Sequence, residues 1–248
     1  MPGGLVGDNS TFGSSLGGFV TSAHRSGGVA LGVLALAVVL GLAWPVMAQE
    51  TGPRVLVATI DGPITPVIVD HVDAALDTAE RRGHEVAVLR MDTPGGLDES
   101  MRKIVQRILS ARVPVVVYVS PQGARAASAG AIITFAAHVA AMAPGTAIGA
   151  STPVDLEGGD VERKVVNDAA AFAESLARLR GRNVEFAVDT VREGRSAAAD
   201  EALEIGVVDL VAGSLPELLD ELDSREVELT ADGDRAVLRT ADAQVDEF

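Results

Sequence analysis

The segment "RAASAGAII", residues 125–133, places one hydroxyl among small apolar residues. Ser128 stands at the start of an apolar run, and the pattern predicts a helix from about Ser128 to Ala141. Two explanations fit a serine at this point. Its oxygen could cap the helix by accepting a backbone N–H. Alternatively, Ser128 could be a nucleophile, because the free N–H groups of a helix N-terminus stabilise a developing oxyanion.

A second turn that exposes backbone N–H groups lies upstream, in "DTPGG", residues 92–96. Gly95 and Gly96 allow the chain to turn sharply after a predicted strand. Loops that leave parallel strands and begin helices meet at the carboxyl edge of a sheet, where sites of α/β proteins form. The small residues around Ser128 would leave room for another chain to approach its hydroxyl; they are Ala126, Ala127, Ala129 and Gly130.

A serine nucleophile needs a base, and the histidines are poor candidates. His138 is expected late in the same helix as Ser128, about 15 Å along its axis. His71 and His84 bracket the first predicted helix and are expected at the surface. None of the predicted positions places a histidine beside Ser128.

The lysines are more informative, because only two of the 20 Lys and Arg residues are lysine. A guanidinium stays charged, whereas a buried lysine can be neutral and act as a base. Lys103 lies among arginines and is expected to be solvated. Lys164 falls in the first turn of a long alanine-rich helix and is either a surface residue or a base that points toward a cleft. A base near neutral pH needs a pKa lowered by about 3 units, so we predict that Lys164 is enclosed by apolar neighbours.

The elements that must position these residues alternate between strand and helix. Strands are predicted in 54–64, 85–96 and 114–120, and helices in 65–83, 97–113, 128–141, 161–180 and within 185–218. The first helix has one apolar face, formed by Val69, Val72, Ala75, Leu76 and Ala79. This alternation predicts an α/β fold, a mainly parallel sheet covered by helices. Residues 226–240 read as two strands around an Asp-Gly turn, and the polar tail 241–248 is expected to be frayed.

The N-terminus has the character of a targeting segment. Residues 1–26 are rich in Gly and Ser and are expected to be disordered, and Gly27–Ala43 is an uncharged apolar run. Arg25 before the run and Glu50 after it predict that the rest of the chain lies across the membrane. Small residues at positions −3 and −1, in Val46-Met47-Ala48, fit cleavage of a signal peptide after Ala48, which would give a secreted protein. An uncleaved single-pass anchor is the alternative.

Composition excludes several kinds of function. The formal net charge of −15 argues against nucleic acid as a partner and against binding to an anionic membrane surface by charge alone. The absence of cysteine excludes disulfides and thiolate chemistry. The four histidines lack metal-ligand spacing, so a metal centre is not expected. With 248 residues, 48% of them hydrophobic, the chain can form one sizeable core.

Four motifs in order resemble the NfeD family of membrane-bound serine proteases, of the ClpP class. They are "MDTPGGLDESMRKIV", "PVVVYVSPQGARAASAGAII", "AMAPGTAIGASTPV" and "EALEIGVVDLV", and the similarity runs from about Val55 to Leu219. The resemblance implies a ClpP/crotonase-like fold without a cofactor. It also implies a membrane partner, because the family is associated with stomatin-like proteins and is thought to cleave their apolar segments. The expected organisation is a targeting region in 1–48, a protease domain in 53–219 and a hairpin with a polar tail in 220–248.

Carried onto this sequence, the resemblance implies roles for four residues. Ser128 matches the nucleophile and Lys164 the general base of a Ser-Lys dyad, while Gly96 and Ala129 match the backbone N–H groups of the oxyanion hole. ClpP has a histidine 25 residues after its serine, but the corresponding segment here reads "GASTPV". The missing histidine agrees with a lysine dyad and removes a His-Asp triad from consideration.

Two other functions remain open beside a protease. An enzyme acting on a CoA thioester would share the fold, but its reaction gives a serine nucleophile no role. The acidic sequence also has no basic cluster that could bind the CoA phosphates. A catalytically silent scaffold that binds a stomatin-like protein is compatible with the same residues. By analogy we expect at least a homodimer. Full-length relatives often continue into transmembrane helices and a small β-barrel, so this chain reads as a short form or a truncation.

Overall fold

The computed structural model describes residues 52–154, 161–229 and 233–248. The predictions for residues 1–48, both the disorder and the targeting segment, lie outside the described residues. Among the helices that are described, none combines the length and the apolar character needed to cross a membrane.

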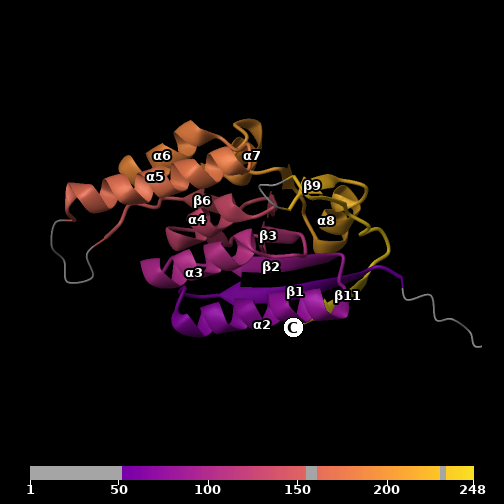
Figure 1. Cartoon of the computed structure of the whole chain (residues 1–248). Helices are drawn as coiled ribbons and strands as arrows, with labels where there is room; N and C mark the ends of the chain where they lie inside the picture. Colours follow the sequence, from indigo (N-terminus) through magenta and orange to yellow (C-terminus); the bar gives the residue numbers. More distant parts are fainter. Residues whose placement is uncertain (1–51, 155–160, 230–232) are drawn as a thin grey trace, which may run out of the picture. The chain divides into compact units, whose positions relative to one another are not determined.

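A six-stranded sheet forms the centre of the fold, and all of its neighbouring strands pair in parallel (Figure 1). Its order is β11-β1-β2-β3-β5-β8. The central strands are continuous apolar runs, as expected where both faces of a parallel sheet are covered. The strands are β1 (Arg54–Asp61), β2 (Val86–Asp92), β3 (Val115–Val119), β5 (Val139–Met142), β8 (Leu210–Val211) and β11 (Gln244–Glu247).

Seven helices in the described ranges cover the sheet: α2 (Pro66–Arg82), α3 (Asp98–Leu109), α4 (Ala129–Ala136), α5 (Arg163–Leu179), α6 (Val184–Arg192), α7 (Ala199–Glu204) and α8 (Leu215–Leu222). One apolar cluster joins one side of the sheet to α2 through α7, and a second joins the other side to α8 and the hairpin of β9 (Glu226–Glu228) and β10 (Arg235–Val237). The predicted α/β fold and C-terminal hairpin are therefore confirmed. The five residues predicted for the buried face of α2 are the five that are buried.

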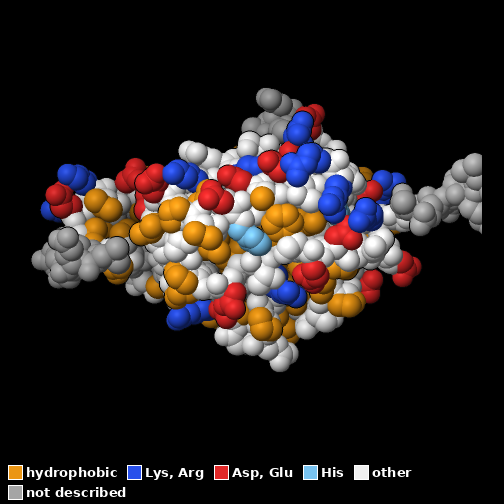
Figure 2. Space-filling model, turned by 90° about the horizontal axis from the view of Figure 1, so that it is seen from below, with side chains coloured by type: hydrophobic (Ala, Val, Ile, Leu, Met, Phe, Trp, Pro, Cys, Tyr) orange, Lys and Arg blue, Asp and Glu red, His pale blue; other side chains and the backbone are white. Residues whose placement is uncertain are grey.

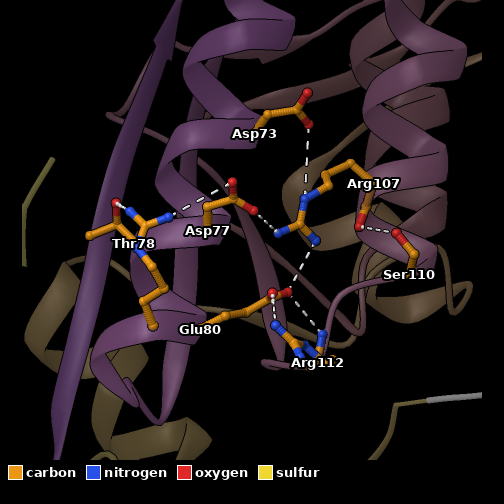
Figure 3. Close-up of polar contacts among 8 residues, drawn as sticks. Asp73, Asp77, Thr78, Glu80, Arg107, Ser110 and Arg112 are labelled. Atoms are coloured by element: carbon orange, nitrogen blue, oxygen red, sulfur yellow. Dashed lines mark hydrogen bonds and ion pairs between the residues drawn. The ribbon is translucent and has the colours of Figure 1, made fainter.

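An ion-pair network fixes α3 against α2 (Figure 3). Arg107 of α3 contacts Asp77 at 3.0 Å and Glu80 at 3.1 Å, and Arg112 binds Glu80 through its guanidinium and its backbone N–H. Burial favours a raised pKa for Glu80, but hydrogen bonds from Arg112 and Arg107 outweigh it and hold the pKa below its ordinary value.

The helix predicted over 128–141 is shorter than expected. It ends at Ala136, and residues 139–142 form β5, which pairs with β3. Every residue of α4 and β5 is buried, so this apolar stretch carries no periodicity that separates a helix from a strand. Strand pairing decides the conformation, and His138 lies in the connection rather than in the helix.

The prediction of a frayed tail is wrong. Residues 244–247 form β11, which pairs in parallel with β1 along one edge of the sheet. Asp246 binds His84 at 2.8 Å and Arg54 at 2.5 Å, and the ring of Phe248 lies 5.2 Å from that of His71 in α2. Figure 2, seen from below, shows apolar side chains gathered around a histidine, with charged residues around them. The tail is polar in sequence because it is an edge strand that is largely exposed.

Candidate active site

Ser128 occupies a tight turn between a strand and a helix. It follows β4 (Arg125–Ala126) and stands at the N-cap position of α4, with φ 52° and ψ −117°. A positive φ is uncommon for serine, and such strain persists at about 1–3 kcal/mol only where the surroundings hold it. The hydroxyl makes no capping hydrogen bond, and in the part of the chain that the structure describes Oγ has no partner. The capping explanation for Ser128 is therefore wrong.

Two hydrogen bonds between Ser128 and the segment after β6 (Ala147–Gly149) hold this strained residue. The Ser128 N–H donates to the carbonyl oxygen of Ala150 at 2.7 Å, and the Ser151 hydroxyl donates to the carbonyl oxygen of Ser128 at 3.1 Å. The N–H of Ser151 in turn donates to the carbonyl oxygen of Thr190 at the end of α6. Sequence reasoning missed Ser151, because these contacts join residues that are far apart in the chain.

The Pro-Gly-Gly turn lies directly against Ser128, as the sequence predicts. A Cβ atom on Gly95 would lie 2.5 Å from the Cβ of Ser128, so only glycine permits this approach. A Cβ atom on Gly96 would lie 2.2 Å from the carbonyl oxygen of Ile64, which pairs with this turn. The turn is thus enclosed by the backbone of Ile64 on one side and by Ser128 on the other.

Two backbone N–H groups beside this contact have no hydrogen-bond acceptor among the described residues. One belongs to Gly96, which follows the glycine that touches Ser128, and the other to Ala129, the first residue of α4. The Ala129 donor also has the positive end of the helix dipole behind it. A serine oxygen with two such donors nearby is suited to attack a carbonyl group and to stabilise the resulting oxyanion.

Lys164 is not buried, contrary to the expectation from its sequence position. Its side chain is 79% exposed and forms an ion pair with Glu162 at 2.8 Å. No hydrogen bond or ion pair within the described ranges joins it to Ser128, and the segment 155–160 shortly before it lies outside them. Lys103 is also exposed, as predicted, and pairs with Glu99.

The helix that carries Lys164 is tied to the start of α3. Arg102 of α3 binds Asp168 of α5 at 2.6 Å, and its guanidinium lies 4.5 Å from the centre of the Phe172 ring. Lys164 lies four residues before Asp168, which is about one helical turn. The lysine therefore lies about one helical turn from the contact between α5 and α3, with its side chain in solvent.

The three histidines in the described part of the chain pack against other elements and do not contact this site. His138 is partly buried, accepts from the N–H of Val115 through Nδ1 and donates from Nε2 to the carbonyl oxygen of Leu229. Burial lowers its pKa to about 4. His84 is buried, beside Asp246, and His71 is partly buried against Phe248, so the prediction of two surface histidines is wrong for His84.

The parallel sheet, its covering helices and the similarity to solved structures place the fold in the ClpP-like class. ClpP1 from Listeria monocytogenes superposes with a TM-score of 0.54 at 19% identity, covering 64% of this chain and 91% of that one. The chain belongs to the family of NfeD1b N-terminal domains, which matches residues 54–231. The predicted fold and the predicted membership of the NfeD family are both confirmed.

Two curated proteins are similar to most of this chain. The membrane-bound protease PH1510 of Pyrococcus horikoshii is 36% identical over 218 residues, which are 86% of this chain and 49% of that protein. The membrane protein NfeD1b of Bacillus subtilis is 26% identical over 196 residues, 74% of this chain and 44% of that protein. The chain thus spans about half the length of the curated relatives it matches.

Solved structures of a stomatin-specific protease, 1510-N, are also similar. A variant with a serine replaced by alanine has a TM-score of 0.76 at 35% identity, covering 79% of this chain and 98% of that one. A variant with a lysine replaced by alanine, in complex with a substrate peptide, has the same TM-score and identity and covers 92% of its own chain.

Proposed function

We propose that this chain is a serine endopeptidase in which Ser128 is the nucleophile. The observation that carries the proposal is the strained, uncapped serine beside two backbone N–H groups that have no acceptor in the part of the chain that the structure describes. The similarity to PH1510, named a membrane-bound protease, supports the same reaction class. A cap or a packing residue would need neither the strain nor the unpaired donors.

In the proposed mechanism, Ser128 Oγ attacks the scissile carbonyl carbon while Lys164 accepts the hydroxyl proton. The N–H groups of Gly96 and Ala129 stabilise the tetrahedral oxyanion. Its collapse breaks the peptide C–N bond, and Lys164 donates the proton to the leaving amine. Lys164 then activates a water molecule, which hydrolyses the acyl-enzyme and restores Ser128.

The exposed position of Lys164 sets a condition on this mechanism. A solvated ammonium does not act as a base near neutral pH, so the lysine must be enclosed when peptide or a second subunit covers the start of α5. Four apolar side chains at the starts of α2, α3 and α5 and in the segment after β6 are 44–76% exposed and could contact such a cover: Val67, Leu97, Val154 and Val165. They also favour an extended apolar peptide as substrate.

The N-terminal sequence and the membrane-bound relatives support a proposal for the location of this activity. We place the domain on the extracytoplasmic side of the membrane, anchored by residues 27–43 or released after Ala48. We propose a stomatin-like membrane protein as the natural substrate, because a protease specific for stomatin is among the similar structures. We also propose at least a homodimer.

A catalytically silent scaffold for a stomatin-like protein is the second candidate, and the solvated Lys164 favours it. The test is to incubate purified residues 49–248 with apolar peptides from the C-terminal segments of stomatin-type proteins. Ser128→Ala and Lys164→Ala are compared with Lys103→Ala, which removes the other exposed lysine. Cleavage by the parent and Lys103→Ala alone supports the protease. Peptide binding by all variants without cleavage supports the scaffold, and equal cleavage by all reveals a contaminant.

A further inference from the structure

Thr93 lies where the two loops of the candidate site meet. It follows β2 directly and is fully buried. Its N–H donates to the carbonyl oxygen of Arg125 at 2.8 Å, and its own carbonyl oxygen accepts the N–H of Ala127 at 3.1 Å. The backbone of Thr93 therefore pairs with the segment that leads into Ser128.

The side chain of Thr93 contacts both loops with different atoms. Its hydroxyl accepts the N–H of Gly95 at 3.1 Å and donates to the carbonyl oxygen of the same residue at 3.2 Å. Its methyl group faces α4, because a Cβ atom on Gly130 would lie 2.5 Å from Cγ2 of Thr93. The hydroxyl thus sets the conformation of the Pro-Gly-Gly turn, and the methyl group packs against the first turn of α4.

We propose that Thr93 is a positioning residue that fixes the distance between the two oxyanion donors, the N–H groups of Gly96 and Ala129. This inference rests on the proposed peptidase function. Gly96 follows the residue held by the hydroxyl, and Ala129 precedes the glycine that meets the methyl group. Oxyanion donors act only when both reach hydrogen-bond distance of one oxygen, and a shift of about 1 Å at a reacting centre can cost roughly 100-fold in rate.

Two substitutions separate the atoms of this side chain. Thr93→Val keeps the shape and the methyl group but removes the hydroxyl, and Thr93→Ser keeps the hydroxyl. Neither touches the backbone bonds to Arg125 and Ala127. Thr146→Val is a matched control, because it removes another buried hydroxyl that bonds only to the carbonyl oxygen of Ala143.

The four proteins are compared by peptide cleavage and by inhibition with a peptide boronate, whose tetrahedral adduct presents an oxygen to the oxyanion hole. We expect Thr93→Val to lower kcat about tenfold or more with KM within about twofold, and to weaken the boronate in parallel. Thr93→Ser should retain kcat within about threefold, and Thr146→Val should match the parent. Thermal unfolding of each variant identifies a loss that comes only from stability.

Parental kcat and boronate affinity in Thr93→Val would overturn the inference. A parent that neither cleaves peptide nor binds boronate would refute the proposed function instead. Crystal structures of the parent and Thr93→Val then decide the role of Thr93 without catalysis. The inference predicts that Gly96 is displaced relative to Ala129 in the variant, and superposable loops contradict it.

Discussion

The surroundings of Ser128, the proposed nucleophile, are formed largely by backbone atoms. The strain of this residue is maintained by hydrogen bonds from the Ser128 N–H to Ala150 and from Ser151 to the Ser128 carbonyl oxygen. The facing turn approaches it closely because Gly95 has no side chain. A sequence can therefore mark the serine and the glycines by type. It does not identify Ser151 or Thr93, whose roles depend on contacts that form only after folding.

At the same scale, Gly96 is predicted to tolerate no side chain. In Gly96→Ala the new Cβ would lie 2.2 Å from a backbone oxygen, so the turn must move and carry its N–H away from the oxyanion. We expect a loss of roughly 100-fold or more in kcat, as for removal of an oxyanion-hole donor, and a lower melting temperature. Peptide cleavage and thermal unfolding measure the two effects.

The control for this substitution is Gly52→Ala. A Cβ atom at Gly52 would have no atom within 4 Å, so this variant should behave as the parent does. Full activity in Gly96→Ala would show that the turn is free to shift without effect, and the assignment of its N–H would be lost.

At the scale of elements, the parts that the sequence predicts are those with a one-sided pattern. Helix α2 buries its predicted face and ends at Gly83, which adopts the left-handed conformation. The stretch from α4 into β5 is buried on all sides, so its sequence has no periodic signal. The sequence therefore predicts one helix where the structure has a helix followed by a strand. For the opposite reason, the sequence does not predict strand β11. An exposed edge strand has too few apolar residues to be distinguished from a loop.

His138 joins three elements and predicts a pH dependence of stability. It links β3 and β5 to the end of β9 through Val115 and Leu229, and its pKa in the folded state is about 4 instead of the ordinary 6.5. As the pH falls, the unfolded chain takes up the proton first. Stability is therefore highest above about pH 6.5 and is lost progressively down to about pH 4, by up to roughly 3 kcal/mol.

Urea unfolding at pH 7.5 and pH 5 tests this for the parent and for His138→Asn. Asparagine offers an acceptor but does not titrate, so the variant should be less stable at pH 7.5 and should lose less stability than the parent on acidification. If both proteins lose the same free energy of unfolding between the two pH values, His138 is not the group responsible.

At the scale of the whole described domain, the last strand completes the sheet beside the first. Deletion of residues 244–248 exposes the edge of β1 and removes the carboxylate that pairs with Arg54 and His84. We expect the melting temperature to fall by more than about 4 °C, because the lost contacts exceed one ion pair. Asp246→Asn should lower it less, since the strand remains paired. Circular dichroism during heating measures both, and a truncated protein that melts with the parent would show that β11 adds nothing.

The pairing of β1 with β11 also bears on the order in which the chain assembles. Arg54 and Asp246 are 192 residues apart in sequence, and closing so long a loop is entropically costly and slow. The segments that surround Ser128 lie within residues 64–190, and the loops that join their contacts are much shorter than this. Docking of β11 is then a late event in folding, absent from the rate-limiting transition state, so it slows unfolding more than it speeds folding. During synthesis, the segments that surround Ser128 can therefore fold before β11 has been made. The strand that slows unfolding of the domain is added last.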